Sequence, residues 1–164
     1  MTAKQVIRQM IAYHHEANRR LWQLIKPLGD EVFCRESGYS IGSIRNHMVH
    51  LMSVDAGWLN GMRGNPPESF VWLDANDFPT IAVTNAWAEQ GMRDLAHQVE
   101  RWSDADLAQV PSGMNEMRWQ VLVHLTTHGV DHRSQVLPLI HAAGGQTMPQ
   151  DFIMHVWGWP PPRH

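Results

Sequence analysis

Apolar residues recur at helical spacing along most of this chain. In residues 3–26 they return every three or four positions, which is the pattern of one buried helix face. That face comprises Val6, Met10, Tyr13, Ala17, Leu21 and Leu24. Pro27 and Gly29 follow, so the helix is predicted to end there and a loop to begin.

Three more long helices are predicted, over about residues 40–63, 80–102 and 116–143. Their candidate N-caps are Ser40 or Ser43, Thr80 or Thr84, and Asn115. Pro138 predicts a bend or an early stop in the last helix, and Gly144 and Gly145 predict its end. The breaks GNPPES and PSGMN separate the helices. SDADL predicts a short turn after the third helix, and a final short helix is expected from about 149–151 to before Pro160–Pro162.

Four long helices without a strand pattern predict an all-α protein, with a four-helix bundle as the architecture. We expect one domain over residues 1–164, with a short extra C-terminal helix, because 164 residues match the length of a single domain. Such bundles commonly hold metal ions between facing helices.

Composition narrows the function classes. The net charge is −3 and no basic run occurs, which argues against nucleic-acid binding. No stretch reaches the roughly 18 apolar residues of a membrane span, and the N-terminus has no signal-peptide core. Cys34 is the single cysteine, so an internal disulfide is impossible. We therefore expect a cytoplasmic protein that acts on a small molecule and contacts neither membrane nor nucleic acid.

Eleven histidines are unusual for this length, and three of them lie in HLTTHGVDHRSQ. His124, His128 and His132 follow one another at four-residue intervals, or about 40° apart on a helix. The apolar stripe of this helix is predicted to contain Trp119, Val123, Val130 and Leu137. His128 and His132 lie beside apolar positions, whereas His124 lies nearer the polar side. Side chains at i and i+4 point the same way, so two imidazoles can meet one ion.

A third ligand is expected from the second helix, where HMVHLMSVDAGW contains His47 and His50. His50 lies at one edge of the predicted apolar arc, and His47 lies on a neighbouring strip. Gly57 and Gly61 lie nearly in line with His50 and would let another helix or a ligand come close.

The two histidine segments resemble the DinB/YfiT-like superfamily. In SIGSIRNHMVHLMSVDAGWLNGMRG the metal-binding histidine of that family corresponds to His50, followed by Asp55 and Trp58. HLTTHGVDHRSQ resembles the later motif through His128, His132, Arg133 and Gln135, and YHHEANRRLWQLI resembles the first helix.

This resemblance implies a four-helix bundle, often a homodimer, with one divalent ion (Zn, Ni, Fe or Mn) on His50, His128 and His132. Relatives include transferases that use low-molecular-weight thiols, a mycothiol-dependent isomerase and proposed metal-dependent hydrolases. Two positions depart from the family pattern. His47 stands where a small polar residue, usually Thr, is common, and Asp131 stands where a second histidine often precedes the His-Arg pair.

Other residues receive weaker expectations. His47 could support the pocket or transfer protons, or be a partly exposed helix residue. Asp55 and Arg133 fall near apolar stripes, so each is expected to have a buried polar partner, which could be the other. His14 and His15 are expected on the rim or surface, and Trp58 and Trp119 in the core. His124, Asp131 and Cys34 are not expected to be ligands or bases.

Three function classes remain open. A three-histidine ion can hold a thiol as thiolate for transfer to an electrophile, or it can activate water for hydrolysis. Thiol transfer fits the characterised relatives in the resembled family better, and it needs no dedicated protein base, of which the motifs show no clear example. The third class is a non-catalytic metal or small-molecule binder, for which a fourth protein ligand would be expected if the ion were structural.

Overall fold

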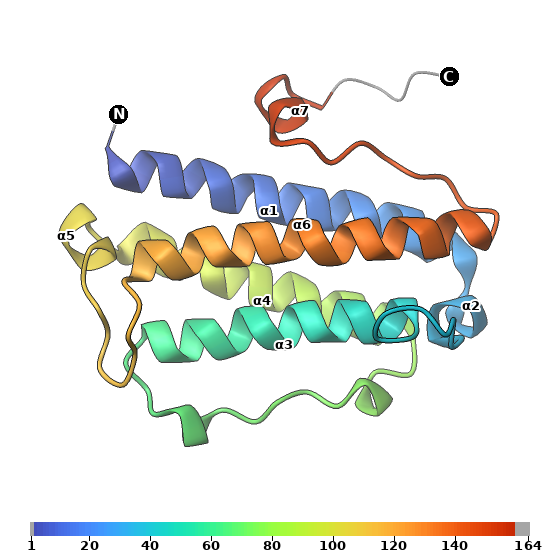
Figure 1. Ribbon diagram of the computed structural model, residues 1–164, viewed down its shortest axis with the longest axis horizontal. Coiled ribbons are helices and arrows are strands. Elements are labelled where there is room, and N and C mark those ends of the chain that lie inside the picture. The colour runs from blue at the N-terminus through green and yellow to red at the C-terminus, as the bar shows by residue number, and fades with distance from the viewer. Residues whose placement is uncertain (1, 160–164) are drawn as a thin grey trace.

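The computed structural model describes residues 2–159 and forms an elongated helical bundle (Figure 1). Its long helices are α1 (Ala3–Ile25), α3 (Ile44–Met62), α4 (Ile81–Arg101) and α6 (Arg118–Ala142). No β-strand occurs within residues 2–159. Helices α1 and α3 each pack against both α4 and α6, so the four form a closed ring. The predicted all-α class is confirmed.

Chain direction explains the longest connection. Helices α1 and α6 run one way along the bundle, and α3 and α4 run the other way (Figure 1). Because α3 and α4 are parallel, the chain between them must travel back along the bundle. Residues 63–80 do so along its outside, through η2 (Pro67–Ser69) and η3 (Ala75–Asp77).

Short helices close the ends of the bundle. The region after Pro27 is not the predicted loop, because it contains η1 (Lys26–Leu28) and α2 (Asp30–Cys34), of which Cys34 is the last residue. Phe33 is fully buried against Trp22, with ring centroids 6.0 Å apart, and burying a Phe side chain contributes roughly 1.5–3 kcal/mol. Helix α5 (Asp104–Leu107) lies at the opposite end, whereas the predicted C-terminal helix α7 (Phe152–Val156) lies alongside α1 (Figure 1). Pro160–Pro162 and His164 lie outside the described residues.

Local chemistry sets most helix boundaries. Ser43 and Thr80 are the N-caps of α3 and α4, accepting hydrogen bonds from the backbone N–H groups of Asn46 and Val83. Asn115 is not a cap, because α6 begins at Arg118 and Gln120 Oε1 accepts the N–H of Met117 at 2.8 Å. Pro138 does not stop α6, which continues to Ala142. Gly144 ends it at φ 81°, and the Gly145 N–H donates to the Ile140 carbonyl at 2.9 Å.

Two predicted helix faces are rotated from those observed. On α1, Val6 is 42% exposed, whereas its neighbour Ile7 is 4% exposed. On α6, the predicted core residue Trp119 is 41% exposed, and Val123, Val130 and Leu137 are only half-buried. The buried stripe of α6 is instead Leu122, Leu125, Gly129, Arg133, Val136 and Ile140. Of the predicted α1 face, Tyr13, Ala17 and Leu21 are buried, so that prediction is right in part, whereas the α6 stripe is misplaced because polar residues occupy the core at mid-helix.

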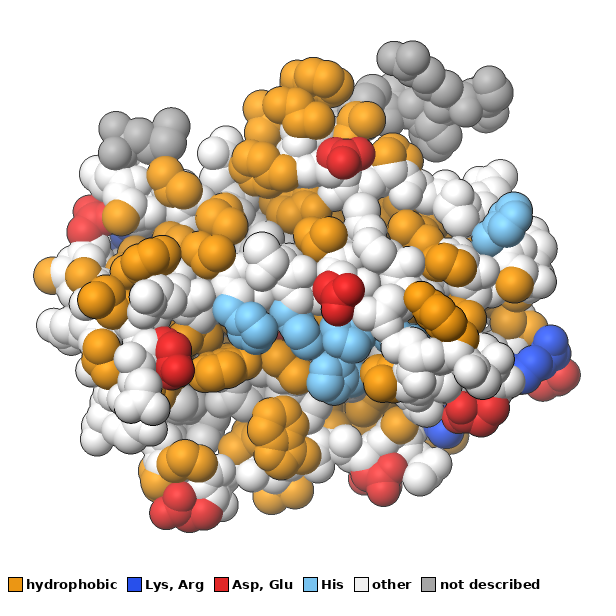
Figure 2. Space-filling view, viewed as in Figure 1, with side chains coloured by type: hydrophobic (Ala, Val, Ile, Leu, Met, Phe, Trp, Pro, Cys, Tyr) orange, Lys and Arg blue, Asp and Glu red, His pale blue; other side chains and the backbone are white. Residues whose placement is uncertain are grey.

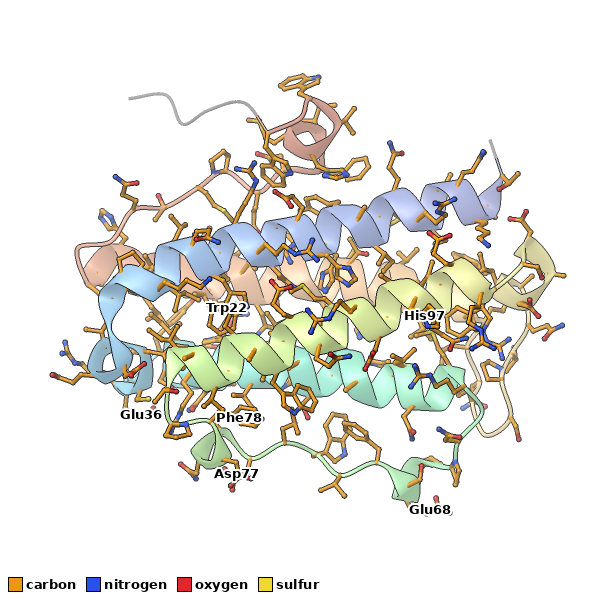
Figure 3. All side chains as sticks on the ribbon, turned by 180° about the vertical axis from the view of Figure 1, so that it is seen from behind. Trp22, Glu36, Glu68, Asp77, Phe78 and His97 are labelled. Carbon is orange, nitrogen blue, oxygen red and sulfur yellow. The ribbon has the colours of Figure 1, made fainter. Side chains whose placement is uncertain are left out.

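The core is divided along the bundle axis. One apolar cluster, at the α2 end, contains Leu21, Trp22, Met48, Val136 and Ile140. A second, at the α5 end, contains Ile7, Leu59, Met62, Leu122 and Leu125. Seen from behind, Trp22 lies at the α2 end of the bundle (Figure 3). Between the clusters the buried side chains are polar: His14, Asn18, His47, His132 and Arg133. This polar layer contains the candidate site.

Candidate metal centre

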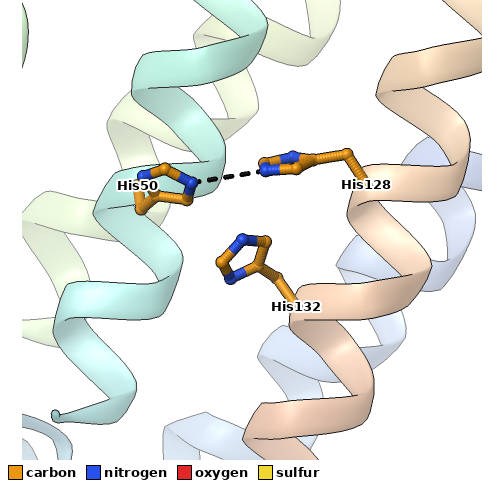
Figure 4. A group of neighbouring side chains, drawn as sticks. All are labelled: His50, His128 and His132. Carbon is orange, nitrogen blue, oxygen red and sulfur yellow. Dashed lines mark hydrogen bonds between the residues drawn. The ribbon is translucent and has the colours of Figure 1, made fainter. Parts of the chain in front are cut away.

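Three histidines meet where α3 faces α6. His50 comes from α3, and His128 and His132 come from adjacent turns of α6 (Figure 4). One nitrogen from each ring lies within 4.8 Å of those of the other two, a spacing that could hold a metal ion. His50 Nε2 and His128 Nε2 are 3.3 Å apart, and the His132 ring centroid is 4.5 Å from both other rings. The predicted trio is therefore brought together.

His47 orients one member of the trio. Its side chain is fully buried, and its Nδ1 lies 3.1 Å from His132 Nδ1. That hydrogen bond leaves His132 Nε2 facing the gap between His50 and His128 (Figure 4). A hydrogen bond to the second ring nitrogen is the usual way in which proteins fix a ligand histidine. Of the two expectations for His47, the partly exposed helix residue is wrong.

Electrostatics keep these imidazoles neutral. Burial, followed by the neighbouring histidines, lowers the pKa of His128 and of His132 to about 4. Burial also lowers the pKa of His50, and burial and then His50 lower that of His47, while Asp131 opposes the latter shift. A neutral imidazole has a free lone pair, which is the form that binds a metal. The donor set therefore fits a divalent transition metal.

Behind the histidines lies a buried polar network. The His14 Nε2–H donates to Asp55 Oδ2 at 3.0 Å, which leaves His14 Nδ1 to accept from Arg133 Nη1 at 3.5 Å. Arg133 Nη1 also donates to Asn18 Oδ1 at 2.8 Å. The Arg133 Nε–H donates to Gln150 Oε1 at 3.1 Å, which ties the C-terminal segment to the bundle.

The expectation that Asp55 and Arg133 have buried polar partners is confirmed, but they do not pair with each other. His14 stands between them and makes a hydrogen bond with each. Burial lowers the pKa of Arg133, and Tyr13 and Asp55 oppose that shift. Such a partnered arrangement is what a buried guanidinium requires.

His14 and His15 are not on the rim or surface, because they are 0% and 4% exposed. Burial, followed by His14 and Arg19, keeps the pKa of His15 well below its ordinary value. A signal for His14 was present: Ile7, Ile11, His14, Asn18 and Leu21 share one helical spacing. Because His14 and Asn18 in that series are polar, a neighbouring face of the helix contained more apolar residues and was predicted to be the buried one.

The remaining candidates lie outside the cluster. His124 is exposed, and Asp131 is exposed and accepts a hydrogen bond from Gln135 at 3.1 Å. The Cys34 thiol lies 3.5 Å from the Pro79 carbonyl and packs with the α2-end cluster. Trp58, expected in the core, is half-buried and packs against the α5-end cluster. Within residues 2–159, the cluster contains no fourth His, Cys, Asp or Glu ligand.

The histidines are also accessible from outside. Histidine side chains form a pale-blue row across the middle of one face, with hydrophobic side chains on both sides (Figure 2). His50 and His128 are half-buried rather than enclosed. A small molecule could therefore reach an ion held between the Nε2 atoms of the three rings.

An all-α bundle with a three-histidine cluster between two helices defines a class of candidate metalloproteins. The sequence model of the DinB family matches residues 1–161, and the chain belongs to that family. A search of curated proteins gave no match. Within residues 2–159, none of the helices has the length and apolar character needed to cross a membrane.

Proposed function

We propose that this protein binds one divalent transition metal (Zn, Ni, Fe or Mn) through His50, His128 and His132, and that it transfers a low-molecular-weight thiol to an electrophile. The observation that carries the proposal is the convergence of three neutral imidazoles from α3 and α6 on one accessible point. Imidazole ligands suit these ions, whereas Mg and Ca prefer oxygen.

When bound, such an ion would hold a thiol as its thiolate, since coordination removes the thiol proton. The protein residues have a limited task in this reaction. His50, His128 and His132 supply three ligands, and His47 holds the His132 ring in place. The thiol proton would pass to solvent, the sulfur would form a new bond to the electrophilic carbon, and the leaving group would depart with the electron pair of the bond that breaks.

Thiol transfer is favoured over hydrolysis by the positions of the acids. A metal-bound water is normally helped by a nearby carboxylate base. Asp55 is engaged by His14, and Asp131 is exposed and engaged by Gln135. A purely structural ion is also disfavoured, because structural zinc sites usually have four protein ligands. The described part of the cluster supplies three.

Metal content of untagged protein, never exposed to a nickel column, tests the metal half of the proposal. Mass spectrometry should find about one equivalent in the wild type and a loss in His50→Ala and His128→Ala. His124→Ala is the matched control, because this exposed histidine lies one turn before His128 and should leave the metal in place. Well-folded protein that takes up neither Zn nor Ni would refute the metal site.

Thiol binding can be tested separately with Co(II)-loaded protein. Low-molecular-weight thiols should produce a sulfur-to-cobalt charge-transfer band, and metal-dependent loss of thiol should follow when an alkylating electrophile is added. His50→Ala should abolish both signals. Metal uptake without a thiol band would leave the metal site standing and reject the transferase.

The proposal extends to the setting of the reaction. The protein works in the cytoplasm, where small thiols stay reduced, and it does so as a homodimer. Apolar side chains exposed on the surface, among them Trp119, Ile153 and Trp157, support self-association. Sedimentation equilibrium should give twice the chain mass, and a monomer at every concentration would reject the dimer alone.

A further inference from the structure

A recess of about 300 Å³ lies between α3 and the loops on either side of its C-terminal half. Its walls are Gly57, Trp58, Gly61, Phe70, Trp72 and Met114. We infer that this recess binds a neutral, flat apolar group of the electrophilic substrate while the reacting end lies at the histidine cluster. The inference rests on the proposed function, and it specifies the substrate class for that site.

The two glycines of α3 let the loop side chains that form the walls of the recess pack directly against the helix. A Cβ at Gly57 would lie 3.2 Å from Phe70 and 3.3 Å from Trp72, and a Cβ at Gly61 would lie 3.2 Å from Met114 Sδ. Glycine inside a helix costs about 1 kcal/mol relative to alanine. At these positions that cost accompanies a close approach of loop side chains to the helix. From the sequence, another helix or a ligand was expected to come close at these glycines. In the structure, loop side chains make the close contact.

Ring contacts join the recess to the candidate metal centre. The Trp58 ring, in the wall of the recess, meets the His124 ring edge-on with centroids 5.6 Å apart. The His124 ring lies in turn 5.4 Å from that of His128. One exposed imidazole therefore separates the recess from a proposed ligand. Figure 2 shows the histidine row bordered directly by hydrophobic side chains.

The chemistry of the walls defines the occupant. Phe70 and Trp72 are fixed at right angles with centroids 5.2 Å apart, although Trp72 is 64% exposed. Aromatic walls favour offset-stacked or edge-on contact with another ring. Glu116 is the only charged residue among those that line the recess. An anionic tail would be repelled by that carboxylate, so a neutral aromatic or compact apolar group fits best.

The probe for the test is 2-naphthylmethanol, a neutral aromatic molecule that carries no thiol and no leaving group. NMR titration of metal-free protein should show saturable binding with shifts at the tryptophan indole signals. Trp72→Ala should weaken binding at least tenfold. Trp157→Ala is the matched control, because Trp157 is 66% exposed on the segment just after α7, and it should bind as the wild type does. Absence of saturable binding, or equal affinity in Trp72→Ala and wild type, would overturn the inference.

A second measurement tests whether the recess serves the metal centre. Co(II)-loaded protein should broaden the naphthyl signals of the bound probe far more than Zn(II)-loaded protein, since the paramagnetic ion lies nearby. Saturable binding without this broadening would show a separate site and overturn the link. If the protein takes up no Co(II), the proposed metal function fails, while the titration of metal-free protein still decides whether the recess binds its apolar ligand.

Discussion

His47 and His132 share a hydrogen bond between their Nδ1 atoms, 3.1 Å apart, in the buried middle of the bundle. For His132 to bind an ion through Nε2, its Nδ1 must carry the ring proton and donate a hydrogen bond to His47. The His47 ring must then accept at Nδ1, so its own proton lies on Nε2. His47, which stands where the resembled family commonly has a small polar residue, thus contacts the candidate site directly.

Replacing His47 should weaken metal binding without removing a ligand. His47→Phe leaves the His132 Nδ1–H without its acceptor, and loss of such a supporting contact typically costs about 10–100-fold in metal affinity. Competition with a chelating zinc indicator would measure the change. His47→Asn offers an amide oxygen near the same place and should recover part of the affinity. Equal affinities for wild type and His47→Phe would rule out the orienting role.

Gly129 should be intolerant of any side chain. A Cβ there would lie 2.5 Å from the His14 ring and 2.8 Å from Arg133 Nη1, both of which are buried. Gly129→Ala should therefore lower the free energy of unfolding by about 1–3 kcal/mol or more, as overpacking does. Urea denaturation would measure it.

Gly91→Ala is the matched control for that experiment. Gly91 is also a helical glycine, but a Cβ on it would meet nothing within 4 Å. Its replacement should stabilise the protein by up to about 1 kcal/mol through helix propensity. Equal effects of the two substitutions would mean that the approach of His14 and Arg133 to α6 is not tight.

Removal of the Arg133 charge should destabilise the fold. Arg133→Met leaves Asn18 Oδ1 and Gln150 Oε1 without their donor, and each buried acceptor left unpaired costs about 1–3 kcal/mol. Thermal and urea unfolding would show the loss. Arg93→Met, at an exposed position on α4, should stay within about 0.5 kcal/mol of wild type. A stable Arg133→Met protein would show that the network contributes little.

The metal-free protein should become less stable as the pH falls into the mildly acidic range. The pKa of His128 and of His132 is about 4 in the folded protein, against an ordinary value of 6.5. Between these values the unfolded chain binds protons that the folded chain excludes. The free energy of unfolding should therefore be highest above pH 6.5 and decrease as the pH falls towards about 4.

Urea unfolding at a series of pH values would test this dependence. His128→Gln and His132→Gln should each flatten the decrease, because they remove one titrating group. His97→Gln is the control, since His97 is exposed on α4 (Figure 3). A wild-type profile that is level from pH 7 to pH 4 would contradict the burial of these rings.

Sequence was sufficient for the helices and for the pairing of His128 with His132 because both depend on short-range spacing. Apolar periodicity identified four long helices, and the four-residue interval between His128 and His132 placed two imidazoles on one face. His50 required a different argument, the resemblance of its segment to a family motif. Its meeting with the α6 histidines, at 3.3 Å from His128, is a property of the packed bundle.

The sequence by itself thus determined the helical class, most helix ends and the residue types available for a metal. Tertiary structure decided which helix face was buried, and it moved Trp119 to the surface and His14 and His15 to the interior. For His14, the reason is that partners on other helices offset the cost of burying a polar side chain. His14 donates a hydrogen bond to Asp55, and His14 and Asn18 accept hydrogen bonds from Arg133 Nη1, across gaps of 41, 119 and 115 residues that no local pattern reports.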